Sequence, residues 1–153
     1  MSARKADPRL DDEARIRDLV AHYADAVTRQ EAGEVSLLFA PAGVWTVTGY
    51  GTHEGRDAVE AFLAGLLGHW DTIVHALLSG RVALDPADPD RARGRWYISE
   101  FGLRTDGTEV FFAGVYHDEY VQRDGTWYFD RRRYDSMFRR TGGEVSTSPF
   151  PTL

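Results

Sequence analysis

The sequence predicts an α+β domain, in which helices gather on one side of a curved, mainly antiparallel sheet and enclose one pocket. Three observations support this prediction. Before residue 68 the apolar residues recur mostly at helical spacing, whereas after residue 72 they follow long strand patterns separated by turn signals. Two Asp-Gly pairs then close tight hairpins, so the last three strands form a meander.

The N-terminal half is expected to hold three helices and one short strand. In the first helix, apolar side chains from Leu10 to Val27 share one face, and acidic residues occupy the first turn. Pro41 marks the end of the second helix. The strand is β-branched or aromatic and leads into a turn. The helices are expected over residues 10–29, 31–39 and 55–67, and the strand over 44–48.

The C-terminal half is expected to hold four long strands, over residues 72–84, 91–104, 108–122 and 126–138. The segment 85–90 contains two prolines and three aspartates and is predicted to be a loop. Asp106-Gly107 and Asp124-Gly125 close the next two hairpins, because Asp-Gly tolerates positive φ. The domain itself is predicted over residues 10–140. A flexible N-terminus (1–9) precedes it, and a tail (141–153) follows as a surface arm or a disordered segment.

Length and composition fit one domain. The chain has 153 residues, of which 42% are hydrophobic, enough to fill a single core. Cysteine is absent, which excludes disulfides, a thiol nucleophile and thiolate metal sites, and agrees with a reducing, cytoplasmic location. No apolar run approaches the roughly 18 residues that a membrane span requires, so we expect no membrane association.

Charge and motif patterns also argue against several partners. The formal net charge of −6 repels nucleic acid. His117, Asp118 and Glu119 are adjacent on a predicted strand, so their side chains alternate between faces, and no metal site is expected. The glycines form neither a phosphate loop nor a dinucleotide fingerprint, so no cofactor is expected.

Several short motifs occur in a characteristic order. They are Ile16 to Leu19, Arg29-Gln30-Glu31, Trp45-Thr46, Gly51-Thr52 with Gly55, and then Gly114, Tyr116, Asp118, Tyr120, Arg123-Asp124-Gly125, Trp127 and Phe129. Together they resemble the hexachlorocyclohexane dehydrochlorinase and scytalone dehydratase group, in the SnoaL-like branch of the nuclear-transport-factor-like superfamily. The resemblance covers about residues 10–138. It implies a cone-shaped α+β barrel with three N-terminal helices on the sheet.

The resemblance also implies a catalytic dyad. Enzymes of this group use a histidine as base and an aspartate that fixes its tautomer. His75 matches the histidine, but Thr28 stands at the acidic position, and a threonine cannot balance an imidazolium. Asp25 lies three residues earlier on the same helix face and is the expected substitute, although a solvated surface carboxylate is the other interpretation. Asp25 or Thr28 is therefore expected to orient the ring.

Other positions are predicted to line the pocket. Arg132 matches a pocket arginine of the dehydrochlorinase, where a guanidinium can stabilise a leaving anion or an enolate. Trp45 corresponds to a pocket tryptophan of that enzyme, and Tyr23 and Tyr50 can donate phenolic hydrogen bonds. The residues expected to bind substrate are Tyr23, Trp45, Tyr50, Phe112 and Tyr116.

Two functions from different classes follow. The first is a cofactor-independent acid/base enzyme, a dehydratase, isomerase, cyclase or HX-eliminating lyase, that acts on a small, cyclic, mostly apolar molecule with His75 as base. The alternative is a non-catalytic ligand-binding protein, or the accessory small subunit of a ring-hydroxylating dioxygenase. Relatives of this fold pair through the outer sheet face, so a homodimer or homotrimer is expected.

Overall fold

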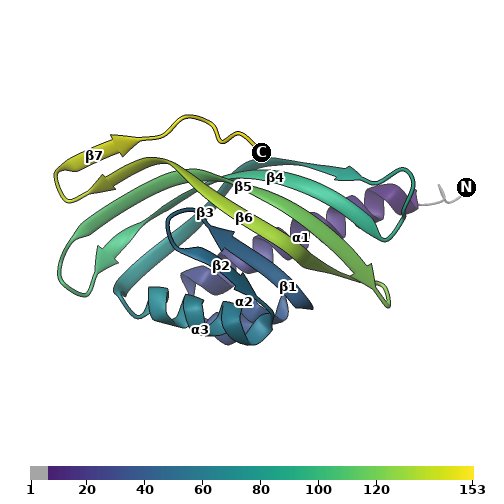
Figure 1. Cartoon of the computed structure of the whole chain (residues 1–153), viewed down its shortest axis with the longest axis horizontal. Helices are drawn as coiled ribbons and strands as arrows, with labels where there is room; N and C mark the ends of the chain where they lie inside the picture. The colour runs from purple at the N-terminus through teal and green to yellow at the C-terminus, as the bar shows by residue number, and fades with distance from the viewer. Residues whose placement is uncertain (1–6) are drawn as a thin grey trace, which may run out of the picture.

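Three helices cover one face of a seven-stranded sheet in the computed structural model, which describes residues 7–153 (Figure 1). The elements follow one another as α1 (Pro8–Thr28), α2 (Ala32–Leu37), β1 (Phe39–Val47), β2 (Gly51–Glu54), α3 (Arg56–Leu67), β3 (Trp70–Leu84), β4 (Arg91–Arg104), β5 (Glu109–Arg123), β6 (Thr126–Thr141) and β7 (Glu144–Thr147).

The sheet is mixed and open. Its strand order is β2-β1-β6-β5-β4-β3, with β7 paired to the end of β6. Among the strands of residues 7–153, only β1 and β6 run parallel, and every other pair is antiparallel. Figure 1 shows β3 to β6 as one curved layer, with all three helices on the same side of it. The predicted α+β fold is confirmed, but the sheet does not close into a barrel.

Helix α1 begins at a proline, preceded by an aspartate cap. The Asp7 side chain accepts a hydrogen bond from the backbone N–H of Arg9 at 3.0 Å, and Pro8 occupies the first turn. The predicted flexible segment 1–9 therefore already holds the first two helical residues, Pro8 and Arg9, while residues 1–6 lie outside the described part. Gln30, with φ 61°, follows the end of the helix.

Pairing with β6 extends the predicted strand 44–48 toward the N-terminus. Phe39 was expected in the second helix, but it is opposite Phe129 of β6 and starts β1. Pro41, expected beyond a helix end, lies within β1 at the register shift between Phe39 and Val44, where proline needs no ladder hydrogen bond.

The C-terminal hairpins follow the turn signals. Asp124 and Gly125 have φ of 51° and 79°, as a two-residue type I′ turn requires. The tail is partly ordered: residues 144–147 form β7 against the end of β6, which now extends to Thr141. This finding corrects the disordered alternative for 141–153. Among the described residues, no helix is both long and apolar enough to cross a membrane.

Candidate active site

A cavity of about 410 Å³ lies between the helices and the concave face of the sheet, a volume typical of small-molecule sites. Its walls are largely apolar and aromatic, with a few polar groups. All five residues expected to bind substrate line it: Tyr23, Trp45, Tyr50, Phe112 and Tyr116. Further lining side chains that the sequence did not single out are Trp70, Glu100, Arg104, Tyr134, Ser136 and Arg139.

His75 faces this cavity from β3 and bonds to a carboxylate. Its side chain is 1% exposed, and Nδ1 lies 2.7 Å from Oε2 of Glu100. The two residues are direct partners in the β3–β4 ladder, so the sheet register itself brings them together. A carboxylate at Nδ1 holds the proton on that nitrogen and leaves Nε2 as the acceptor. Within residues 7–153, no hydrogen bond occupies Nε2.

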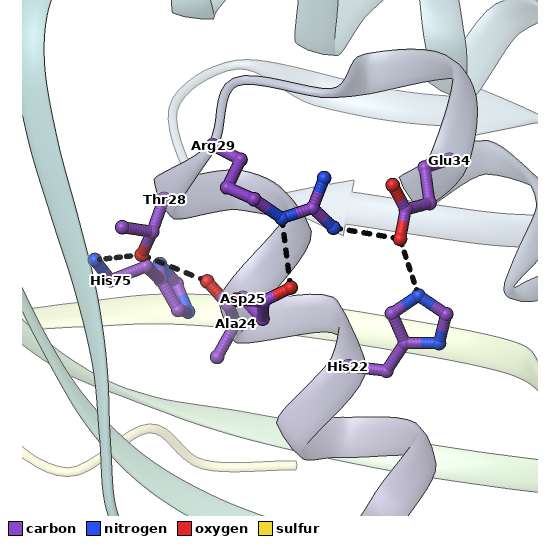
Figure 2. Close-up of polar contacts among 7 residues, drawn as sticks. All are labelled: His22, Ala24, Asp25, Thr28, Arg29, Glu34 and His75. Carbon is purple, nitrogen blue, oxygen red and sulfur yellow. Dashed lines mark hydrogen bonds and ion pairs between the residues drawn. The ribbon is translucent and has the colours of Figure 1, made fainter.

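Thr28 supports the backbone of His75 rather than its ring. The Thr28 hydroxyl accepts a hydrogen bond from the His75 backbone N–H at 3.0 Å and donates one to the carbonyl of Ala24 at 2.9 Å (Figure 2). The residue at the expected acidic position thus fixes β3 against α1. It does not orient the imidazole.

Asp25 lies outside the cavity. Its side chain is 64% exposed, and its carboxylate accepts a hydrogen bond from Nε of Arg29 at 2.9 Å. Arg29 also donates to Glu34, which contacts His22, so all four residues form one surface network (Figure 2). The structure therefore does not bring Asp25 to His75, because this part of α1 turns Tyr23 inward and Asp25 to solvent.

Two phenols lie beside the imidazole. The hydroxyls of Tyr23 and Tyr116 are 3.4 Å apart, and the Tyr23 ring meets the His75 ring edge-on at 5.7 Å. Burial raises the pKa of Tyr23 to about 12, with a partial offset from the charge of Arg132, and burial raises the pKa of Tyr116 well above 10. Both phenols therefore remain protonated at neutral pH and are able to donate hydrogen bonds.

Arg132 lies behind these tyrosines and does not line the cavity, which corrects its expected position. Its side chain is 1% exposed, and its Cζ is 3.6 Å from the centre of the Tyr116 ring and 4.0 Å from that of Tyr23. Nε lies 3.4 Å from Oδ1 of Asp118. The guanidinium thus contacts the two rings rather than the cavity itself.

Asp118 belongs to a buried polar chain. The Tyr120 hydroxyl donates to Asp118 at 2.8 Å and accepts from the indole N–H of Trp96 at 2.7 Å. Gly94 leaves room for this contact, because a Cβ there would lie 2.6 Å from the Tyr120 hydroxyl. All of these side chains are buried.

The titration of Asp118 predicts a pH-dependent stability. Burial raises the pKa of Asp118 from 3.8 to about 6, against the opposing effects of Arg132 and Tyr120. Between these values the folded chain binds more protons than the unfolded chain, so this group's contribution to stability decreases as the pH rises from about 4 to 6 and is constant above. We expect Asp118→Asn to remove that slope in urea denaturation measured from pH 4.5 to 7. Equal slopes in both proteins would contradict the assignment.

Glu100 was not among the predicted site residues, and its pairing with His75 had only a weak signal in the sequence. A hairpin whose loop is 85–90 places positions near 75 and 100 opposite each other. The register shift between Leu77 and Ser79 decides which side chain of β4 is actually opposite His75, and no local pattern predicts that shift. Within the described residues, no group of three or more His, Asp or Glu side chains is placed to hold a metal ion.

The fold has solved counterparts. The crystal structure of an NTF2-like protein with a cystatin-like fold from Novosphingobium aromaticivorans superposes with a TM-score of 0.70 at 23% identity and covers 83% of this chain and 82% of that one. The family model of the SnoaL-like domain matches residues 8–133. The chain belongs to this family.

Individual relatives agree with this assignment. The gamma-hexachlorocyclohexane dehydrochlorinase of Sphingobium indicum is 27% identical over 126 residues, which are 81% of this chain and 80% of that protein. The crystal structure of LinA gives a TM-score of 0.80 at 24% identity and covers 92% of this chain and 96% of that one. A LinA-type3 dehydrochlorinase from Novosphingobium barchaimii gives 0.79 at 22% identity and covers 92% and 97%.

Proposed function

We propose that the chain is a cofactor-independent lyase of the dehydratase or HX-eliminating type, which acts on a small, cyclic, mostly apolar molecule with His75 as its base. One observation carries the proposal: His75 bonds through Nδ1 to Glu100 at 2.7 Å inside an aromatic cavity. The dehydrochlorinase relative and the family match support the elimination type.

In the proposed reaction, Nε2 of His75 removes a proton from a carbon next to a carbonyl or next to the carbon that bears the leaving group. The electron pair of the broken C–H bond forms the new double bond, and the leaving group departs with its own electron pair. Glu100 stabilises the imidazolium that results. When the leaving group is hydroxide, the proton on His75 completes a water molecule.

In this proposal, Tyr23 and Tyr116 stabilise the negative charge that develops during the reaction. Their phenolic O–H groups lie beside the imidazole and remain protonated, so either can donate to an enolate oxygen or to the departing anion. Arg132 faces the far side of both rings, where its charge favours negative charge developing at the hydroxyls. In this arrangement Arg132 is a positioning residue and the tyrosines are the donors.

Glu100→Gln tests the proposed dyad directly. The amide can hydrogen-bond to the ring but cannot balance its positive charge, so we expect turnover to decrease by about 10²-fold. The assay follows elimination and solvent-deuterium exchange on a panel of cyclic ketones, cyclic alcohols and halogenated rings. Glu109→Gln, at the exposed start of β5, is the control and is expected to keep the parental rate.

Full activity of Glu100→Gln would contradict the dyad. Tight binding of panel members by the parent protein without any exchange or turnover would favour the non-catalytic alternative, a carrier or an accessory subunit.

We also propose a cytoplasmic homodimer or homotrimer that pairs through the outer face of the sheet. Phe101 and Phe111 stack there with ring centres 6.5 Å apart, and Phe101 remains 41% exposed. Such an apolar pair on a sheet surface is suited to contact a second copy, which light scattering would detect as a two- or threefold mass.

A further inference from the structure

Two arginines line the cavity without an acidic partner. Arg104 lies at the end of β4, and Arg139 lies near the end of β6. Neither side chain forms an ion pair or a hydrogen bond with any residue of the described range 7–153. By contrast, Arg91 and Arg133 each bind a carboxylate. Unpaired guanidinium groups in a cavity wall are available to a ligand.

Both guanidinium groups lie over aromatic rings of the cavity wall. The Cζ of Arg104 lies 5.8 Å from the centre of Trp70, and the Cζ of Arg139 lies 5.5 Å from the centre of Phe112. The two rings meet edge-to-face with their centres 6.4 Å apart. Stacking on a ring face restrains a guanidinium but leaves its N–H edge free to donate to an anion.

The sheet register relates Arg139 to the base. His75 is opposite Glu100, Glu100 is opposite Phe112, and Phe112 is opposite Arg139, so one row crosses β3, β4, β5 and β6. Three strand spacings separate its two ends, roughly 14 Å of backbone. A ring held against Phe112 would therefore lie between the proposed base and the guanidinium of Arg139.

The acidic groups of the cavity are already engaged. Glu100 bonds to His75, and the Asp106 carboxylate accepts from the backbone N–H of Thr108 at 2.9 Å. The contacts with Thr108 and, to a smaller extent, the charge of Arg104 lower the pKa of Asp106, but Asp106 and Arg104 form no ion pair. Arg104 and Arg139 are thus the charged groups that a ligand can pair with directly.

We propose that the ligand of this cavity carries a permanent anionic group, a carboxylate, which binds at Arg104 and Arg139 while its cyclic body packs on Trp70 and Phe112. This inference names the substrate class of the proposed function and rests on it for the role of His75. This substrate class distinguishes the chain from an enzyme whose substrates are only uncharged rings.

The test compares two probes of the same ring and size, 2-naphthoate and 2-naphthamide, by calorimetry and tryptophan fluorescence at low salt. We expect the parent protein to bind 2-naphthoate at least tenfold more tightly, since both guanidinium groups can donate to its carboxylate. Arg104→Gln and Arg139→Gln are each expected to reduce a tenfold preference to about threefold, because the remaining guanidinium then supplies half of the free-energy difference.

Arg140→Gln is the matched control. Arg140 follows Arg139 on the same strand and also lies over a phenylalanine, Phe111 at 5.6 Å, but it is outside the cavity. The control is expected to keep the tenfold preference. Equal binding of the two probes, failure of both to bind, or an equal loss in Arg140→Gln and Arg139→Gln would overturn the inference.

The binding test is independent of turnover. A preference for 2-naphthoate in a protein that turns over neither the panel members nor their carboxylate-substituted derivatives would support the anion site and count against the proposed reaction. Turnover of uncharged rings without any preference between the probes would overturn the anion site alone.

Discussion

His75→Asn is expected to lower turnover on the ring panel by about 10²- to 10⁴-fold, the usual contribution of a general base. Asparagine keeps a polar side chain of similar reach but cannot accept a proton at neutral pH. The ring is 1% exposed, and Glu100 holds its Nδ1. The decrease should appear in kcat and in deuterium exchange, while ligand affinity stays near the parental value.

His22→Asn serves as the control for this substitution. His22 lies on the outer side of α1, where its 45% exposed side chain contacts Glu34 away from the cavity. Its replacement should leave the rate unchanged. A His75→Asn protein that retains the parental rate would remove the acid/base mechanism and leave only a binding cavity.

Arg132→Met is expected to reduce the free energy of unfolding by about 3–5 kcal/mol, the typical cost of breaking a buried ion pair on one side. The substitution leaves the Asp118 carboxylate in the core without its guanidinium, and it also removes the contact with the faces of Tyr23 and Tyr116. Urea denaturation at pH 7 measures the change. Arg131→Gln, at an exposed position of the same strand, should change it by no more than about 0.5 kcal/mol.

A double variant separates the ion pair from simple packing. Arg132→Met with Asp118→Asn removes both charges and should recover part of the lost stability, because no uncompensated charge stays buried. A double variant as unstable as the sum of the two single variants would indicate independent contributions. If the recovered protein keeps its activity, the charge of Arg132 is dispensable for the chemistry.

Local chemistry made much of the fold predictable. The Asp124-Gly125 turn depends on the φ tolerance of two adjacent residues, so its signal is contained in the sequence itself. Phe39 shows the limit of such signals. Its local pattern continues a helix, but pairing with Phe129, ninety residues away along the chain, places it in a strand.

The location of the site residues could be predicted from the sequence better than the contacts between their side chains. Strand alternation correctly turns Arg132 inward, yet it cannot indicate that two tyrosines lie between that side chain and the cavity. Helical spacing likewise leaves Asp25 close to the inward face, and its exposed position results from how α1 packs on β3. Glu100 depends on a register shift between two strands, which is a long-range property.

The placement of the proposed acid/base pair on neighbouring strands affects how a ligand reaches it. His75 and Glu100 are fixed by the same backbone ladder, and α1 touches this pair's backbone through the hydroxyl of Thr28. A helix that swings outward to admit a bulky molecule would break that hydrogen bond and move Tyr23 away from the imidazole, but it would leave the side chains of His75 and Glu100 at their original separation. Movement of α1 to admit a ligand therefore does not separate the proposed base from its carboxylate. In a site whose carboxylate is carried by the helix, the same movement would separate them.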